Sequence, residues 1–449
     1  MKHINSPVHS IALVDVNNFY ASCEQLFAPQ LEGLPVVILS NNDGCIIARS
    51  NEAKTLGIPM GAPLHLYKTL IKQNKILVYS SNYTLYGDMS SRVMNSLNYL
   101  VPDMEIYSID EAFLSLKKFN NKTLLDEMFT IRQSIYQWTG IPVSIGVGPT
   151  KTLAKLANKM AKKHSSNGIY ILTISNQLTN ILNDLQLEDI WGISKGWANR
   201  LKSIGINNPL QLQQSDPCKI RKLISVVGER IVYELRGNSC LALEEIVNKK
   251  SITVSRSFGK MINDKYNLKE ALANHVARAA EKLRHQECLC GEICVFINTN
   301  RFRKKDLQYN NSATLIFNDL TNNTAVIIQQ AFKLLESLYR PNYNYKKIGV
   351  ILLDLKQRKK DFINKNYIIQ SNLFTYTKNE KINASQSDIH MKILDGINAK
   401  MGKMTIFYGS QGIIKQRRRE KKEEDKWRMR SGYKSPFYTT NWNDILKVS

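Results

Sequence analysis

The first third of the chain mixes two hydrophobic periods. Short Ile-, Leu- and Val-rich runs are typical of buried strands, whereas apolar residues three and four positions apart are typical of amphipathic helices. The runs predict strands over 9–16, 35–39, 105–116 (two strands with a tight turn at Asp110 and Glu111) and 141–147, and helices over 52–57, 83–100 and 150–163. The Asp43-Gly44 pair predicts a hairpin turn by supplying a positive φ. The mixture predicts an α/β or α+β unit for residues 1–170.

The pattern changes three times in the rest of the chain. Residues 173–247 are helical in period and punctuated by Gly and Pro, and the polar, basic stretch 246–251 predicts a linker. Strands return from 251 to 357 around two helical stretches, which predicts a second, smaller α+β domain. Residues 356–449 lose periodicity, which predicts a tail that is flexible or folds on a partner.

Composition adds a class of partner. The 449 residues carry 62 Lys and Arg against 38 Asp and Glu, a net charge of +24, and 43% of them are hydrophobic. This hydrophobic content argues against disorder throughout, and the longest apolar runs, such as Ile348 to Leu353, are too short to span a bilayer. The charge favours a polyanion, with nucleic acid ahead of an anionic membrane surface or a merely solubilising role.

The seven cysteines do not form a zinc pattern. Cys288, Cys290 and Cys294 cluster, but the chain has no CxxC pair and no matching His pair. Such cysteines are typical of small buried side chains in a reducing cytosol. We therefore expect a cytoplasmic protein without structural zinc.

Three carboxylates suggest a catalytic site. Asp15 ends a predicted buried strand, and Asp110 and Glu111 lie at a predicted strand-turn-strand tip. Each alone is explained as a turn former or a solvated turn. On adjacent strands they would lie on one rim, where carboxylate oxygens suit Mg²⁺. Two such ions about 4 Å apart activate an attacking hydroxyl and stabilise a leaving pyrophosphate.

Several segments then carry a family resemblance. They are DVNNFYASCE at 15–24, SNNDGCIIARSNEAKTLG at 40–57, SSNYTLYGDMSSRVM at 80–94, EIYSIDEAF at 105–113, VGPTKTLAKLANKMAKK at 147–163 and SRSFG at 255–259. In this order they resemble the Y family of translesion DNA polymerases. The resemblance covers nearly the whole chain, including SPFYTTNWNDILKV near the C-terminus.

The resemblance implies an α+β multidomain, right-hand polymerase. It implies a palm, small fingers, a helical thumb with a helix-hairpin-helix, an α+β little finger and a basic C-terminal tail. The expected boundaries are 9–18 and 86–172 for the palm, 19–85 for the fingers, 173–247 for the thumb, 251–357 for the little finger and 358–449 for the tail.

The resemblance also implies the catalytic residues. The family holds two Mg²⁺ ions on the positions that match Asp15, Asp110 and Glu111, with help from the backbone carbonyl that matches Val16. All three carboxylates are present here. Many members have a second acid at the position of Asn17, and the amide found here argues against Asn17 as a metal ligand.

The nucleotide contacts follow in the same way. Tyr20 matches the steric gate, an aromatic ring that collides with a ribose 2′-hydroxyl, and Phe19 is expected in the core. Lys162 matches a lysine that contacts the incoming triphosphate, on a predicted helix with one basic face. Lys54 stands where many members have a triphosphate-binding Arg, so it keeps the charge and loses the two-pronged geometry. Asn51 replaces a phosphate-contacting Tyr of some members.

DNA contacts are expected from two regions. Residues 187–206 resemble a helix-hairpin-helix, in which a Gly-containing turn at Gly192 offers backbone N–H groups to a phosphate. Ser194 replaces the usual second Gly, and an ordinary helical hairpin is the alternative. In the little finger the candidate backbone contacts are Arg256, Arg301, Arg303, Lys304 and Lys305.

Partner proteins are expected at the C-terminal end. Gln370, Leu373 and Phe374, in the segment QSNLF, resemble the peptide by which bacterial polymerases bind the sliding clamp. The resemblance further implies a processed UmuD-type dimer and a RecA filament. The basic run 415–434 is expected to bind DNA or protein, or to be solvated.

We therefore expect an error-prone translesion DNA polymerase of the SOS response. It would add dNTPs to a primer 3′-hydroxyl past damaged bases, in the cytoplasm at the nucleoid. One alternative is a non-catalytic DNA-binding scaffold, which loss of a carboxylate would have favoured. The other is a different palm-type nucleotidyl transferase, such as a reverse transcriptase or nucleotide cyclase. The predicted helix-hairpin-helix, little finger and clamp peptide argue against it.

Overall fold

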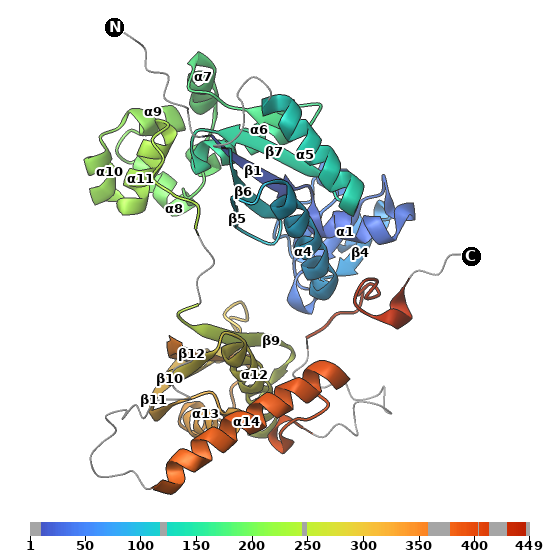
Figure 1. Ribbon diagram of the computed structural model, residues 1–449, viewed down its shortest axis with the longest axis vertical. Coiled ribbons are helices and arrows are strands. Elements are labelled where there is room, and N and C mark those ends of the chain that lie inside the picture. Colours follow the sequence, from blue (N-terminus) through green and yellow to red (C-terminus); the bar gives the residue numbers. More distant parts are fainter. Residues whose placement is uncertain are drawn as a thin grey trace. The chain divides into compact units, whose positions relative to one another are not determined.

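The chain divides into two compact units (Figure 1). The computed structural model describes residues 10–116, 124–244, 249–357, 378–402, 404–412 and 429–445, with the backbone alone for 378–388. One unit comprises Met1–Ile246 with Gly432–Ser449, and the other comprises Val247–Ser431. Within the described ranges no helix is long and apolar enough to cross a membrane.

A five-stranded sheet forms the centre of the first unit, in the order β5-β6-β1-β7-β8. Its strands are β1 (Ile11–Val16), β5 (Met104–Ile106), β6 (Glu111–Ser115), β7 (Val143–Gly148) and β8 (Ile169–Ile171). Three helices pack on it: α4 (Tyr83–Leu100), α5 (Leu124–Thr139) and α6 (Lys151–His164). The helices predicted over 83–100 and 150–163 are therefore confirmed, and β1 runs antiparallel to both of its neighbours.

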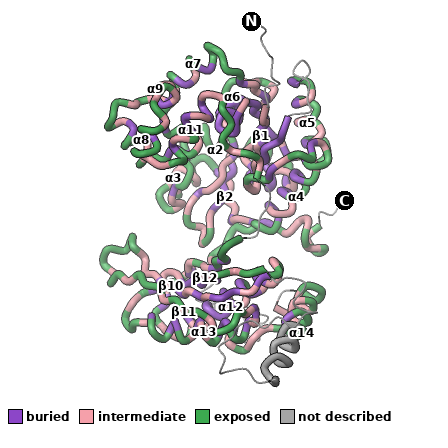
Figure 2. Tube along the Cα trace, turned by 60° about the vertical axis from the view of Figure 1, so that its left-hand side comes forward, coloured by how far each residue is buried: buried purple, intermediate pink, exposed green. Residues whose placement is uncertain are grey.

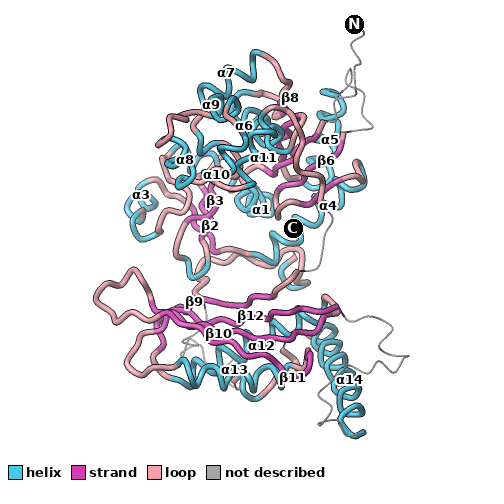
Figure 3. Tube along the Cα trace, turned by 90° about the vertical axis from the view of Figure 1, so that its left-hand side faces the viewer, coloured by secondary structure: helices cyan, strands magenta, loops and turns pink. Residues whose placement is uncertain are grey.

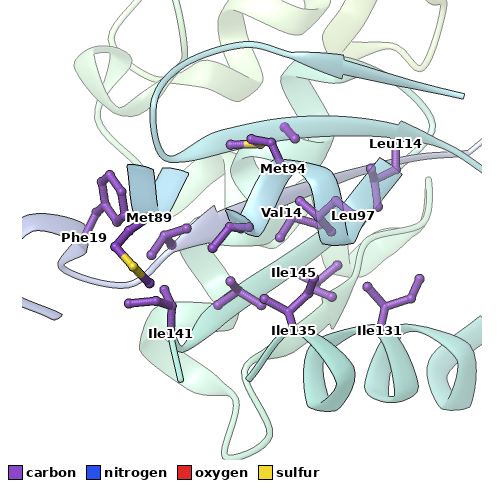
Figure 4. Close-up of a cluster of buried hydrophobic side chains, with 14 of the residues drawn as sticks. Val14, Phe19, Met89, Met94, Leu97, Leu114, Ile131, Ile135, Ile141 and Ile145 are labelled. Atoms are coloured by element: carbon purple, nitrogen blue, oxygen red, sulfur yellow. The ribbon is translucent and has the colours of Figure 1, made fainter. Parts of the chain in front are cut away.

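Alternation along β1 separates a core face from a site face. Val14 packs with Leu97 of α4 and with Ile135 and Ile145 in the apolar cluster under α4 and α5 (Figure 4). The next residue, Asp15, has the opposite orientation and faces α6, because successive side chains of a strand point to opposite faces. The same alternation that buries the core therefore presents the carboxylate to α6.

Two glycines of β7 allow α6 to lie directly on the sheet. A Cβ added at Gly146 would lie 2.0 Å from the backbone nitrogen of Asn158, and one at Gly148 would lie 2.8 Å from that of Ala154. Real Cβ atoms do not approach so closely, so only glycine permits this contact. The close approach brings the lysines of α6 within reach of the sheet's carboxylates.

A smaller three-stranded sheet, in the order β3-β2-β4, follows β1 in sequence. Its region contains α1 (Phe19–Phe27), β2 (Val36–Leu39), β3 (Ile46–Arg49), α2 (Asn51–Thr55), α3 (Lys68–Gln73) and β4 (Leu77–Ser80). The hairpin predicted between β2 and β3 is present, but its positive φ values belong to Asn42 and Asp43. Gly44 has a φ of −85°, so within the predicted Asp-Gly pair the positive φ is supplied by Asp43 and not by the glycine. Asn and Asp tolerate the left-handed region better than most side chains.

A helical region packs on the outer side of α6. It contains α7 (Asn176–Asp184), the 3-10 turn η4 (Leu187–Asp189), α8 (Lys195–Lys202), α9 (Pro209–Gln214), α10 (Pro217–Leu223) and α11 (Val226–Leu235). Leu153, Leu156 and Met160 of α6 share one apolar cluster with these helices. The apolar face predicted for this helix is therefore buried between the two layers.

The second unit is a four-stranded antiparallel sheet with helices on one face (Figure 3). Its order is β11-β10-β12-β9. The elements are β9 (Ile252–Ile262), α12 (Lys265–His285), β10 (Cys288–Thr299), β11 (Asn310–Thr321), α13 (Thr324–Leu338), β12 (Tyr345–Gln357) and α14 (Lys378–Met401). Buried residues concentrate in β10, β12 and α12 (Figure 2), as the predicted α+β pattern requires.

The helix α14 was not predicted from the hydrophobic pattern. Ile389 and Ile393 are exposed on it, and Met391 is its buried apolar residue among the described side chains. The helix is joined to α12 by a two-pronged ion pair between Arg284 and Asp395, at 2.6 and 2.8 Å. Ile389, Ile393, Ile397 and Met401 recur every four positions, so the prediction that residues 356–449 lose periodicity was wrong for this stretch.

Candidate active site

The two adjacent strands β1 and β6 bring the three predicted carboxylates to one place. Asp15 lies directly opposite Glu111 in the antiparallel register. Asp110 precedes β6, and its carbonyl accepts a hydrogen bond of 2.9 Å from the nitrogen of Val16. The connection between β5 and β6 occupies Tyr107 to Asp110, one position earlier than the predicted turn, and Glu111 is already the first strand residue. This one-residue difference directs Glu111 to the same face as Asp15.

The basic face of α6 meets these carboxylates. The Nζ of Lys162 lies 2.6 Å from Oδ1 of Asp15. The Nζ of Lys155 lies 2.8 and 2.9 Å from the two carboxylate oxygens of Glu111. The hydroxyl of Ser108 donates a 2.6 Å hydrogen bond to Oδ1 of Asp110. Each of the three carboxylates therefore has a polar partner.

Burial and mutual repulsion disfavour the charge of Asp15. Burial is the main cause that raises the pKa of Asp15 to about 6, and the charges of Glu111 and Asp110 raise it further. Lys162 acts in the opposite direction and lowers this pKa. Because burial and neighbouring carboxylates disfavour the ionised form of Asp15, a bound cation would stabilise that form.

The donor set suits a hard divalent cation, although the side chains lie apart. Three carboxylates and the carbonyl of Val16 offer oxygen ligands, the kind that Mg²⁺ takes. Among the described residues no group of three or more His, Cys, Asp and Glu side chains is gathered closely enough to hold a metal ion. In this arrangement Lys155 and Lys162 supply the positive charge to Glu111 and Asp15.

A cavity of about 700 Å³ opens beside the carboxylates. It lies between the five-stranded sheet with α6 and the η4–α8 segment, and its lining includes Asp15, Glu111, Lys155, Lys159, Lys162, Lys163, Trp191, Gly192 and Ser194. Glu188 and Asp189 also line it, so four lysines lie beside four carboxylates, a set of charges that suits a phosphate chain bound together with cations. Gly192 and Ser194, predicted as phosphate contacts, thus lie on the same cavity as the carboxylates.

Of the two helices expected in the helix-hairpin-helix at 187–206, the structure has only the second, α8. The segment before the turn is the three-residue η4, and α8 follows it. Gly192 adopts a φ of +91°, which favours glycine. Ser194 is the N-cap of α8 and accepts a 3.4 Å hydrogen bond from the nitrogen of Trp197. The departure from glycine at Ser194 therefore supplies a helix cap.

Sequence reasoning missed an aromatic enclosure around Lys155. Its Nζ lies 4.4 Å from the ring centre of Tyr107 and 5.3 Å from that of Trp191. The indole of Trp191 donates a 3.2 Å hydrogen bond to the Tyr107 hydroxyl. Nearby, Lys159 pairs with Asp189 at 2.5 Å. These contacts hold η4 against α6, and no spacing rule connects residues so distant in sequence.

Tyr20 occupies a half-buried position in an aromatic group. It lies in α1 next to Phe19, which points into the core as expected (Figure 4). Its ring stacks on that of Tyr86, with centroids 4.3 Å apart and planes at 15°. Burial is the main cause that raises the pKa of the Tyr20 phenol, and the charges of Tyr83 and Asp110 raise it further. Asn17 accepts a 2.8 Å hydrogen bond from the Ser144 hydroxyl.

Lys54 lies close enough to the carboxylate site to be affected by its charge. Burial is the main cause that lowers the pKa of Lys54, Lys162 lowers it further and Asp15 raises it. Its Nζ donates to the side-chain oxygens of Asn18 and, at 3.4 Å, of Asn51. Asn18 and Asn51 therefore hold the Lys54 ammonium in place.

The other predicted contacts lie in the second unit. Arg256, Arg301 and Arg303 are exposed. Arg301 lies 4.9 Å over the Phe302 ring, and Arg303 pairs with Asp306 at 3.5 Å. The clamp-peptide residues Gln370, Leu373 and Phe374 lie outside the described residues, as does most of the basic run 415–434.

Three family models match successive parts of the chain. Residues 14–159 match the impB/mucB/samB family, residues 249–363 its C-terminal domain, and residues 391–448 a domain of unknown function. The chain is 40% identical to the protein UmuC of Salmonella typhimurium, over 97% of this chain and 99% of the relative. It is 39% identical to ImpB of the same organism, over 97% and 98%. DNA polymerase IV of Picrophilus torridus is 32% identical over 54% of this chain and 70% of its own length.

Solved structures show the same fold. A Y-family DNA polymerase chimera of Dbh and Dpo4 has a TM-score of 0.64 and 22% identity, covering 78% of this chain and 100% of that one. The insertion ternary complex of Dbh DNA polymerase has a TM-score of 0.53 and 23% identity over the same shares. The fold is therefore that of the right-hand polymerases, with palm and little finger.

The relatives define the chain as a DNA-directed DNA polymerase, and its fold is that of the Y-family polymerases. Within that class the chain belongs to the impB/mucB/samB family, which the match to UmuC over almost its whole length establishes. Its relatives support a role in translesion DNA synthesis, and divalent metal ions are the general cofactors of such polymerases. The two expected alternatives, a non-catalytic scaffold and another class of nucleotidyl transferase, are not supported.

Proposed function

We propose that the protein extends a primer past damaged template bases by two-metal nucleotidyl transfer, as part of the SOS response to DNA damage. One observation carries the proposal: Asp15 and Glu111 lie opposite each other on adjacent strands, with Asp110 beside them, at the edge of a lysine-lined cavity. The near full-length similarity to UmuC supports the damage-response role. We keep the boundaries of palm, fingers, thumb, little finger and tail proposed from the sequence.

The residues that would hold two Mg²⁺ ions are Asp15, Asp110 and Glu111, with the carbonyl of Val16. Bound there, the ions would lower the pKa of the primer 3′-hydroxyl and neutralise charge on the phosphates. Lys54 and Lys162 bind the triphosphate of the incoming dNTP. The Nζ of Lys162 lies 2.6 Å from Oδ1 of Asp15, so it is beside the proposed metal ligands.

Tyr20 is the proposed steric gate. Its half-buried ring is fixed by stacking on the ring of Tyr86. A fixed ring under the sugar excludes a 2′-hydroxyl by collision, and a mobile ring would yield to it. Rigidity of the ring is therefore the property that sugar selection requires.

DNA contacts and partners complete the proposal. Backbone groups around Gly192 and Ser194 hold a template or primer phosphate, and Arg256, Arg301 and Arg303 hold the duplex without reading its sequence. Y-family polymerase complexes, such as the insertion ternary complex of Dbh DNA polymerase, support nucleic acid and nucleotide as substrates. We further propose a sliding clamp bound through Gln370, Leu373 and Phe374, a processed UmuD-type dimer and a RecA filament, in the cytoplasm at the nucleoid.

Primer extension on a template with one abasic site tests the catalytic assignment. Wild type is compared with Asp110→Asn and Glu111→Gln, with Mg²⁺ and dNTPs, with and without clamp, UmuD-type dimer and RecA filament. The matched control is Asp126→Asn, an exposed acid on α5. We expect extension past the lesion by wild type and control, and a loss of about a thousandfold or more in the two site variants. Equal extension by all four proteins would contradict the proposed site.

A further inference from the structure

The described C-terminal residues 432–441, here called the docked segment, lie on the first unit. The nitrogen of Gly432 donates a 2.8 Å hydrogen bond to Oδ2 of Asp43. The nitrogen of Ser80, at the end of β4, donates a 2.9 Å hydrogen bond to the carbonyl of Tyr433. Tyr438 stacks on Phe27, with ring centres 5.0 Å apart and planes at 9°. The segment is therefore joined to the first unit by backbone pairing, an ion-assisted hydrogen bond and ring stacking.

The deepest contact of the docked segment is Ser435. Its side chain is 6% exposed. Its hydroxyl donates a 3.0 Å hydrogen bond to Oε1 of Glu24. It also accepts a 2.9 Å hydrogen bond from the side-chain amide of Asn82, the residue that caps α4. Asn82 reaches the carbonyl of Pro436 as well, at 3.0 Å.

Glu24 links this contact to the aromatic group of the nucleotide site. The Glu24 side chain is 1% exposed, and its Oε1 also accepts a 2.6 Å hydrogen bond from the Tyr86 hydroxyl. Burial raises the pKa of Glu24, and the hydrogen bonds from Tyr86 and Ser435 lower it. A buried carboxylate is stable only when hydrogen bonds compensate for its lost water, so both hydroxyls contribute to keeping it in place.

Tyr86 in turn supports Tyr20. The two rings stack at 4.3 Å, and Tyr83 meets Tyr20 edge-on at 6.2 Å. Tyr86 itself is completely buried and cannot shift without opening the core. The Tyr86 hydroxyl is thus bound to Glu24, which also accepts a hydrogen bond from Ser435 of the docked segment. The Tyr20 ring stacks on the ring of Tyr86.

We infer that the docked segment is a positioning element of the nucleotide site, which fixes the Tyr20 ring through Ser435, Glu24 and Tyr86 and so sharpens discrimination against ribonucleotides. The inference rests on the proposed gate role of Tyr20. Ser435, Glu24 and Tyr86 act through Tyr20 and touch no substrate in this account. The segment lies within the C-terminal region that matches a domain of unknown function, and this is a role for part of it.

The test measures the ratio of kcat/KM for a dNTP to that for the matching rNTP, on undamaged primer-template. Ser435→Ala removes the donor from the segment, and Tyr86→Phe removes the second donor while keeping the ring. The control is Trp442→Ala, at an 89% exposed position that follows the segment. Tyr20→Ala reports separately on the gate. Thermal unfolding of every variant measures stability, because a purely structural role would lower stability without changing the ratio.

We expect Ser435→Ala and Tyr86→Phe to lower the ratio by about tenfold, since a small displacement of a positioning group has effects of up to about a hundredfold. Trp442→Ala should leave it unchanged. If Tyr20→Ala lowers the ratio while Ser435→Ala and Tyr86→Phe leave it at the wild-type value, the inference is overturned and the gate stands. If Tyr20→Ala itself has no effect, the gate proposal fails and the inference falls with it.

Discussion

The two units of the molecule differ in how far their charged side chains are buried. Among the described residues of the first unit, four charged side chains are almost completely buried: Glu24, Glu105, Lys151 and Glu234. Among the described residues of the second unit, no Asp, Glu, Lys or Arg is buried to that extent, and burial lowers the pKa of the buried His275 to about 4, so it stays neutral. The second unit keeps its arginines Arg256, Arg301 and Arg303 exposed.

This contrast fits two different tasks: catalysis in the first unit and binding of a polyanion in the second. Buried charges are costly unless they are paired, but once paired they have fixed positions, which a catalytic site needs. Exposed arginines on a neutral core remain free to follow a flexible polyanion. The following variants test the contrast from the largest expected effect to the smallest.

Lys151→Met should give the largest loss of stability. The Lys151 ammonium lies 2.5 Å from Oε2 of Glu105 and 2.7 Å from the carbonyl of Ala242. Removing it leaves Glu105 buried without its counter-charge, which costs about 3–5 kcal/mol in comparable sites. Chemical denaturation measures the change in the free energy of unfolding. Lys163→Met, at an exposed position of the same helix, is the control, and equal losses in both variants would refute the expectation.

Asp15→Asn should stabilise the protein while abolishing synthesis. The raised pKa of Asp15, about 6 against an ordinary 3.8, means that its charge opposes folding at neutral pH. Removing the charge should raise the free energy of unfolding by about 2–3 kcal/mol in chelator at pH 7. The gain should shrink as the pH falls through 6, because wild-type Asp15 then takes up a proton in the folded state. A destabilised Asp15→Asn protein would show that pairing with Lys162 outweighs repulsion.

His275 should give the opposite pH dependence in the second unit. Its pKa of about 4 lies below the ordinary 6.5, so the unfolded state binds more protons between these values. Its contribution is complete above pH 6.5 and is lost as the pH falls towards 4, by about 2 kcal/mol between pH 7 and pH 5. Denaturation of His275→Gln at both pH values should show this part of the slope removed. An unchanged slope would mean that other groups cause the acid sensitivity.

Arg303→Ala should have the smallest effect on folding, below about 0.5 kcal/mol. Its effect should fall on DNA binding instead, weakening affinity on every sequence alike and reducing the salt slope by about 1. Binding to labelled duplex across a salt series measures both. Lys333→Ala, an exposed cation on α13, is the control. Sequence-dependent loss of affinity in Arg303→Ala would show base contact rather than backbone contact.

Local patterns predicted the elements that bury apolar faces. The helices over 83–100 and 150–163 and the strand ending at Asp15 depend on neighbours in sequence, so periodicity identifies them. The pairing of β1 with β6, and hence the meeting of Asp15 with Glu111, was predicted from motif order and chemistry. The register then shows Glu111 as the first residue of β6 rather than part of a turn.

What the sequence did not predict depends on distant or non-periodic contacts. Trp191 reaches Tyr107 across 84 positions, and no local rule pairs them. Helix α14 is held to α12 by an Arg284–Asp395 ion pair, and the apolar spacing of Ile389 and Ile393 was overlooked because it lies in a polar stretch. The docked segment was expected to be flexible or to fold on a partner, but in the structure it contacts Glu24, Asp43 and Ser80 of the same chain.

The docking of Ser435 also affects the protein during its synthesis. Glu24 and Ser435 are separated by 411 positions. At roughly 5–20 residues per second, the ribosome needs about 20–80 s to deliver the hydroxyl after the carboxylate has been made. During that interval Glu24 lacks one of its two hydroxyl partners, and a chain that stops early never acquires it. Completion of the N-terminal unit is thus linked to completion of translation, which leaves prematurely ended chains less stable than finished ones.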